Sequence, residues 1–146
     1  MHAEAWIRLL KTHRTLTREL DAQLEAKHGL SMSGLEALIC LSVAKGRSLH
    51  LSALATRCGL SLSRISRLTG SFEARGLVER RAVESDRRAV QAHLTDAGLE
   101  LARRAQVTQS ASVQRLFLER LSDEDTALLA EVFSRFRPTR EIASSR

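Results

Sequence analysis

Four glycines, at positions 29, 46, 59 and 76, each follow a segment whose apolar residues recur every three or four positions. This spacing places the apolar side chains on one face of a helix, and glycine commonly ends a helix. The helices predicted in this way cover about residues 3–27, about residues 33–45, a brief segment capped by Ser52, and a fourth segment that starts at Leu60 and Ser61. A chain divided so often into short amphipathic helices is expected to fold as one small, mainly helical domain.

The segment after Gly76 changes from a helical to an alternating pattern. Residues 89–94 alternate between the two faces of an extended chain, and a period of two is typical of a half-buried strand. We therefore predict a small β-hairpin whose strands, 77–83 and 89–94, flank the charged tip 84–88. A short extended piece is also expected at 48–51.

Helix starts are predicted from capping residues. Ser33 with Glu36 and Ser122 with Asp125 have the spacing of a capping box, in which a hydroxyl and an acidic side chain three residues later satisfy free backbone N–H groups. With Thr95 as a further cap, the helices predicted are 33–45, a long one from Thr95 to about Arg120, and a last one from Ser122 to about Phe136. Residues 139–146 are expected to form a loose tail.

The brief helix, the turn at Gly59 and the fourth helix form one pattern. In the fourth helix three apolar residues share a face, while polar and basic residues look outward: Ile65, Leu68 and Phe72 inward, and Ser63, Arg64, Ser66 and Arg67 outward. This order is typical of helix-turn-helix DNA readers. The alternative is an ordinary pair of helices with one solvated face.

The net charge of +6 favours a polyanionic partner, such as nucleic acid or an anionic membrane surface. Residues 57–88 hold eight arginines and four acidic residues, so the excess positive charge is concentrated in the middle of the chain. Arginine suits bidentate contacts to phosphate and guanine, although genomic base composition produces the same bias.

Several function classes are not expected. The chain has no apolar run of about eighteen residues and no apolar signal-peptide core at its N-terminus, so we expect a cytoplasmic protein without a membrane segment. Cys40 and Cys58 match neither a disulfide framework nor a zinc site, and both are expected to be reduced and buried. The five histidines lack the spacing of a catalytic or metal site, so we predict no metal, no cofactor and no enzymatic activity.

Three short motifs carry a family resemblance: Gly76–Arg80, Asp86–Val90 and Leu94–Gly98. Together they resemble the wing signature of the MarR family, the multiple-antibiotic-resistance type of regulator. Leu54-Ala55 and residues 61–68 also resemble the helix-turn-helix of that family. The resemblance covers nearly the whole chain and implies a winged helix-turn-helix protein that binds double-stranded DNA and regulates transcription.

The chain departs from the family pattern on the fourth helix. Arg64 stands where the family usually has a small hydroxyl residue, and Gly70-Ser71-Phe72 replaces a stretch that is typically acidic, basic and Leu. Gly70 is expected to weaken this helix by up to ~1 kcal/mol relative to Ala. These departures leave the operator sequence open but do not affect the predicted fold.

The residues expected to contact DNA are Ser61, Leu62, Ser63, Arg64, Ser66, Arg67, Asp86, Arg87 and Arg88. A reader helix enters the major groove with its N-terminal turns, where Arg67 is the favoured base contact. Ser61 and Ser63 are expected to cap the helix and bind phosphate. Leu62 either contacts a thymine methyl group or is a chance surface leucine.

At the hairpin tip, Arg87 or Arg88 is expected to enter the minor groove. The family motif favours Arg88, with Asp86 bracing its guanidinium through a charge-assisted hydrogen bond. The alternative is a weak salt bridge on the surface of an ordinary hairpin.

One such domain, residues 1–146, reads too few base pairs to find an operator, so we predict a homodimer on a pseudo-palindromic site. The helix-turn-helix and wing would occupy about 48–95, and the dimerisation helices about 3–27 and 96–137. The alternative is that the apolar terminal helices pack within a single chain.

The resemblance also implies a repressor released by a small aromatic or anionic effector bound between the first, second and fifth helices. The candidate pocket residues are Trp6, His13, Leu35 and Ile39, with Arg14 as counter-ion, and each also fits a role in packing or on the surface. Redox sensors of the family carry a reactive cysteine in the first helix, which is absent here. The rival function is a winged-helix module that binds DNA non-specifically or binds proteins, without an effector.

Overall fold

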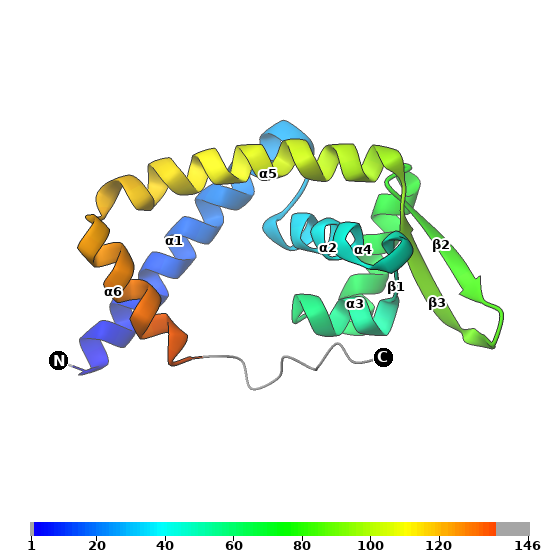
Figure 1. Ribbon diagram of the computed structural model, residues 1–146, viewed down its shortest axis with the longest axis horizontal. Helices are drawn as coiled ribbons and strands as arrows, with labels where there is room; N and C mark the ends of the chain where they lie inside the picture. Colours follow the sequence, from blue (N-terminus) through cyan, green and yellow to red (C-terminus); the bar gives the residue numbers. More distant parts are fainter. Residues whose placement is uncertain (1, 137–146) are drawn as a thin grey trace. The chain divides into compact units, whose positions relative to one another are not determined.

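The computed structural model describes residues 2–136, and for residues 2 and 86–88 it describes the backbone alone. The chain divides after Ser112 into two compact units. The first contains α1 (His2–His28), α2 (Met32–Val43), η1 (Lys45–Arg47), β1 (Ser48–His50), α3 (Leu51–Cys58), α4 (Leu62–Ala74), β2 (Val78–Val83), β3 (Asp86–Leu94) and most of α5 (Asp96–Leu116) (Figure 1). The predicted mainly helical fold with a small β-hairpin is confirmed.

Gly29, Gly59 and Gly76 follow helix ends as predicted, whereas the second helix ends at Val43 and Gly46 lies within η1. Gly29, Gly46, Gly59 and Gly76 all have positive φ, a conformation that costs glycine little and other residues more. At Gly59, for example, φ is 63°, and its N–H donates to the carbonyl oxygens at the end of α3. The turn between α3 and α4 therefore depends on a left-handed residue.

Two predicted helix caps are wrong. Helix α2 begins at Met32, shortly after Leu30, which is buried in the core. Ser31, rather than Ser33, caps the helix by accepting a hydrogen bond from Gly34 N (3.0 Å). Helix α3 begins at Leu51, so Ser52 lies inside the helix instead of capping it. The chain passes directly from strand to helix there, because the preceding residue still pairs with β3.

The three strands form an antiparallel sheet in the order β1-β3-β2, with Leu49 opposite Ala92 and Arg80 opposite Ala92 on the other side. The wing, which we define as β2, β3 and the turn between them, extends away from the helices (Figure 1). Its turn is Glu84-Ser85, so the predicted tip at 84–88 is too long. Residues 86–88 belong to β3, and the register shifts between Ala82 and Val83.

The core of the first unit lies where α2, α3, α4 and the sheet meet. Its largest fully buried apolar side chains are Leu24, Leu30, Leu35, Leu38, Leu41, Leu54, Ile65, Val78 and Leu94. Among the described side chains of α1, only Leu20 and Leu24 are buried, and both belong to the C-terminal third of the helix. The rest of that helix leaves apolar side chains in solvent.

The base of the wing is fixed to the start of α5. As predicted, Thr95 caps this helix by accepting from Gly98 N (3.0 Å). It also ties the helix to the start of β2, because its hydroxyl donates to Gly76 O (2.7 Å) and its N–H donates to Leu77 O (3.1 Å). Helix α5 ends at Leu116, not near Arg120.

The second unit contains the end of α5, η2 (Leu118–Arg120) and α6 (Asp123–Ser134). The predicted capping box is confirmed: Ser122 Oγ accepts from Asp125 N (3.1 Å), and Asp125 Oδ2 accepts from Ser122 N (3.0 Å). Helix α6 exposes two large apolar side chains, Leu128 and Phe133, and Phe136 is exposed just after the helix ends. The predicted tail, 139–146, lies outside the described residues.

Candidate nucleic-acid interface

Helix α4 begins with a cap made by its own sequence. Ser61 has an extended backbone and its Oγ accepts from Arg64 N (3.2 Å), which satisfies one of the free N–H groups of the first turn. Ser63 does not cap the helix; its hydroxyl lies 3.4 Å from that of Ser61. Two hydroxyl groups therefore gather at the helix start.

The exposed face of α4 is the one predicted to face DNA. Ser61, Leu62, Ser63, Arg64 and Arg67 are exposed, and Leu62 keeps 55% of its surface in solvent. Ser66 was also predicted to point outward, but its side chain is half-buried. The opposite face holds Ile65, Thr69 and Phe72, which are fully or almost fully buried. We call the exposed side of α4, with Ser61, Leu62, Ser63, Arg64 and Arg67, the reader face. The buried side of the helix packs in the core, and the exposed side chains can contact a partner.

The C-terminal end of α4 is held by a residue that the sequence did not single out. Arg75 donates to the carbonyl oxygens of Gly29 (2.7 Å) and His28 (2.9 Å) at the end of α1. These acceptors are carbonyls that a helix end leaves without partners. Arg75 therefore fixes the end of α4 to the end of α1, and sequence spacing could not reveal a contact across forty-six positions.

The two described arginine side chains of the wing are already in ion pairs. Arg80 Nε lies 2.9 Å from Glu73 Oε2, and Arg81 Nη2 lies 2.6 Å from Glu79 Oε2. Among the described side chains, no ion pair involves Arg64 or Arg67. Within α4, Arg64 and Arg67 are therefore available to an external anion.

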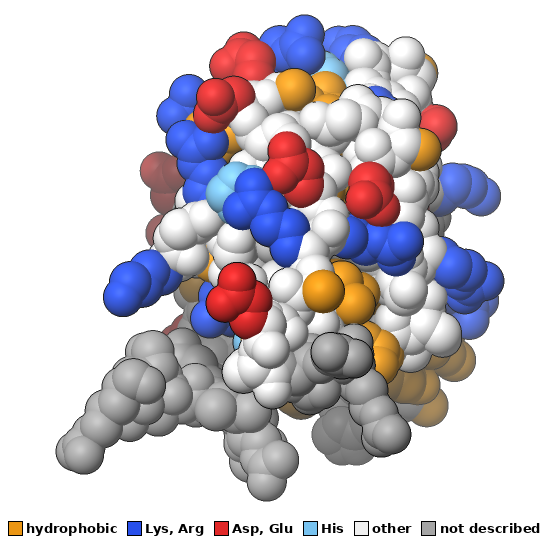
Figure 2. Space-filling model, turned by 90° about the vertical axis from the view of Figure 1, so that its right-hand side faces the viewer, with side chains coloured by type: hydrophobic (Ala, Val, Ile, Leu, Met, Phe, Trp, Pro, Cys, Tyr) orange, Lys and Arg blue, Asp and Glu red, His pale blue; other side chains and the backbone are white. Residues whose placement is uncertain are grey.

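Figure 2 views the hairpin end of the molecule. Lys and Arg side chains protrude at both edges of this face, and acidic side chains lie between them. Asp86, Arg87 and Arg88 belong to the part of β3 next to the turn, and their side chains are outside those the structure describes. Their predicted role at the wing tip stays a prediction.

An open hollow of about 220 Å³ lies between α4, the wing and the junction of β1 with α3. It is lined by His50, Leu51, Ser52, Leu62, Ser66, Ala89 and Val90. This position explains why Ser66 is half-buried although helical spacing points it outward. The start of α3 was not predicted to border the reader face, because only the pairing of β1 with β3 brings it there.

The candidate effector residues lie on two helices with different exposure. Trp6 (60% exposed), His13 and Arg14 are exposed on α1. On α2, Leu35 is fully buried in the core and Ile39 is half-buried. Leu35 therefore offers no surface to a ligand in this conformation, and the effector pocket stays a prediction.

Cys40 and Cys58 are half-buried rather than buried as predicted, and both are free thiols. Burial, the neighbouring Cys40 thiol and the Glu36 carboxylate raise the pKa of Cys58 to about 12. Because the thiolate is the form that reacts with oxidants, this thiol is expected to be unreactive at neutral pH.

We predict that peroxide leaves the affinity for DNA unchanged. Replacing Cys40 and Cys58 with Ser should change the affinity neither with peroxide nor without it. A DNA titration with and without peroxide measures this. Release of DNA by peroxide in the wild type, abolished by either substitution, would contradict the prediction.

Within the described residues, no helix is long and apolar enough to cross a membrane, and no group of three or more His, Cys, Asp or Glu side chains has the geometry of a metal site.

A short helix, a left-handed turn, a capped helix with a free basic face and an adjoining hairpin define a winged helix-turn-helix protein. The sequence model of the MarR family matches residues 28–89. This match, together with a solved MarR family transcriptional regulator that is 37% identical over 90% of this chain, shows that the chain belongs to the MarR family of transcriptional regulators.

Two solved structures from Streptomyces coelicolor illustrate the relationship. AbsC, a MarR family transcriptional regulator, is 37% identical, with 90% of this chain and 88% of that one covered and a TM-score of 0.80. Sco3205, a MarR family transcriptional regulator solved in complex with DNA, is 27% identical, with 94% and 88% covered and a TM-score of 0.85. A search of curated proteins gave no match.

Proposed function

We propose that the chain is a sequence-specific regulator of transcription that binds double-stranded DNA as a homodimer. The observation that carries this proposal is the reader face of α4, which presents exposed hydroxyls and two arginines without ion pairs among the described side chains. The complex of the related Sco3205 with DNA supports the same partner.

In this proposal α4 lies in the major groove and the wing reaches the next minor groove. Arg67 makes a bidentate contact to a guanine, while Ser61 and Ser63 bind phosphate and Leu62 contacts a thymine methyl group. At the wing, Arg88 enters the minor groove, with Arg87 beside it and Asp86 bracing the guanidinium.

The dimer places two such units on a pseudo-palindromic operator. Its proposed surface comes from the terminal helices, which expose large apolar side chains: Trp6, Ile7 and Leu9 on α1, and Leu128 and Phe133 on α6. Large apolar side chains exposed on a helix are typical of protein interfaces. The repressor role and release by a small aromatic or anionic effector rest on the family resemblance.

Arg67→Ala and Arg88→Ala test the two DNA elements separately. Arg67→Ala removes a base contact, so we expect a loss of ~1–3 kcal/mol in binding free energy and a relaxed preference at one position of each half-site. Arg88→Ala removes a minor-groove and phosphate contact, so binding should weaken across many sequences with a shallower salt dependence.

Titrations of selected and mismatched duplexes over a series of salt concentrations measure both effects. Arg18→Ala, which removes an exposed arginine from α1, is the matched control. If Arg88→Ala keeps the wild-type affinity and salt slope while the protein stays folded, the wing does not insert into the groove.

A further inference from the structure

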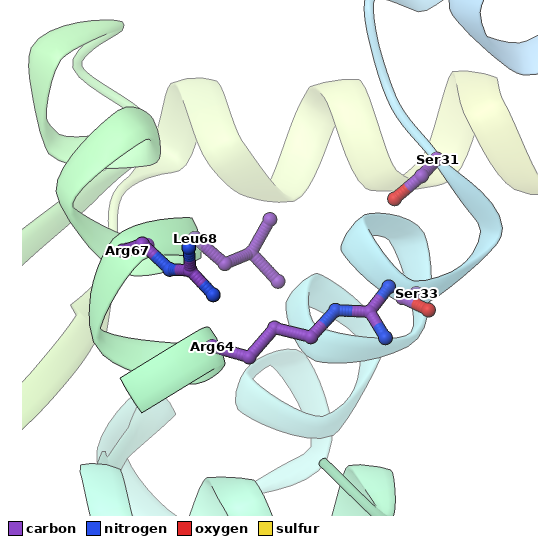
Figure 3. Close-up of a pocket in the computed structure, with 5 residues that line it drawn as sticks. All are labelled: Ser31, Ser33, Arg64, Arg67 and Leu68. Atoms are coloured by element: carbon purple, nitrogen blue, oxygen red, sulfur yellow. The ribbon is translucent and has the colours of Figure 1, made fainter. Parts of the chain in front are cut away.

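A hollow of about 330 Å³ lies between the start of α2 and the exposed side of α4. It is lined by Ser31, Ser33, Arg64, Arg67 and Leu68. Figure 3 shows Arg64 extending from α4 across this space toward Ser33, with Leu68 pointing into the same space and Arg67 on the adjoining turn. Two cationic side chains and the first turn of a helix therefore border one hollow.

The donors around this hollow can be accounted for one by one. The N–H groups of Met32 and Gly34 already donate, to Asp21 Oδ1 (2.7 Å) and Ser31 Oγ (3.0 Å). The N–H and hydroxyl of Ser33 have no acceptor among the described contacts, and the first turn of α2 contains no acidic residue. The guanidinium groups of Arg64 and Arg67 also lack a carboxylate partner among the described side chains.

This set of donors suits one small anion with several acceptor oxygens. A guanidinium group offers paired N–H donors, and a free N–H in the first turn of a helix adds the favourable end of the helix dipole. The hollow is open to solvent, so a group attached to a larger molecule can enter it. Phosphate, with its charge and its oxygens in several directions, matches these donors.

We propose that this hollow binds a single phosphate group, held by Arg64 together with the N–H and hydroxyl of Ser33. Resting on the proposed function, we assign the group to a backbone phosphate of the DNA that α4 reads. Arg64, one of the positions at which the chain departs from the family pattern, then positions the protein on DNA instead of reading a base. Arg67 borders the hollow from the side that faces the bases.

The DNA arm of the test uses Arg64→Gln, which keeps a polar side chain and removes the charge. We expect affinity to fall about tenfold on selected and unrelated duplexes alike, and the salt slope to become shallower by about one. Arg103→Gln removes an exposed charge from α5, outside the helix-turn-helix and wing, and should change neither quantity. Ser33→Ala should weaken binding in the wild type but much less in Arg64→Gln, because both residues hold the same phosphate.

The second arm uses inorganic phosphate and no DNA. It therefore tests the phosphate site even if the protein does not bind double-stranded DNA. We expect added phosphate to shift the backbone amide resonances of Ser33 and Gly34 in a saturable way, and this shift to disappear in Arg64→Gln. Unfolding midpoints of the variants verify that each is folded.

The outcomes separate the parts of the proposal. Saturable amide shifts without any effect of Arg64→Gln on DNA binding would keep the phosphate site but overturn its assignment to the DNA backbone. No amide shift together with an unchanged salt slope would overturn the site itself. A loss confined to one base pair in Arg64→Gln would show that Arg64 reads a base, which contradicts the proposal.

Discussion

Gly98→Ala is expected to lower the free energy of unfolding by about 3 kcal/mol, at the upper end of the usual cost of overpacking. A Cβ at this position would clash with the Leu77 carbonyl oxygen and would lie 2.6 Å from a methyl group of Leu94. The carbonyl cannot retreat easily, because it accepts from Thr95 N at the base of the wing. The substitution therefore forces α5 and the wing apart.

Gly70→Ala is the matched control, because it makes the same change inside another helix. The nearest atom to its Cβ would be Arg80 Nη1 at 3.9 Å, so the methyl group fits. Alanine is the better helix former, and we expect a gain of about 0.5–1 kcal/mol. Urea unfolding of both variants measures the difference. Equal stability of Gly98→Ala and the wild type would mean that the joint between α5 and the wing is loose.

Deletion of residues 122–146 is expected to convert the proposed dimer to monomer or to make the protein insoluble, because it removes the apolar surface of α6. A monomer binds one half-site at a time, so operator affinity should fall by about a hundredfold or more. Analytical ultracentrifugation and a DNA titration measure the two effects. A well-folded dimer of the shortened chain would contradict the proposed interface.

A point variant tests the same surface without shortening the chain. Leu128→Asp places a charge on an exposed apolar position of α6, where Leu128 keeps 58% of its surface in solvent. Val43→Asp makes the same kind of change on α2, at a residue that is 76% exposed and outside the terminal helices. We expect only Leu128→Asp to dissociate the proposed dimer.

Element types were predictable because they depend on local patterns. Apolar spacing and the left-handed glycines located the helices and their ends, and alternation located the hairpin. The Ser122 capping box was predictable for the same reason, since both partners lie within one turn. The position of Ile65 and Phe72 on the buried face of α4 also followed from helical spacing alone.

The features that escaped prediction depend on contacts between distant residues. Ser33 and Ser52 fit the capping pattern, but the burial of Leu30 and the pairing of His50 with Gln91 shift the helix starts away from them. The bond from Arg75 to the end of α1 spans forty-six positions. The hollow beside Arg64 exists only because α2 and α4 lie together.

The ratio of affinities for a selected and an unrelated duplex tests sequence-specific binding most directly. DNA fragments retained by the purified full-length protein identify the selected sequence, and a competition titration against unrelated duplex at fixed salt gives the ratio. We predict a ratio of about a thousandfold or more, the lower end for specific regulators. A ratio near one, from a protein that is folded and still binds DNA, would contradict the account and favour a non-specific winged-helix module.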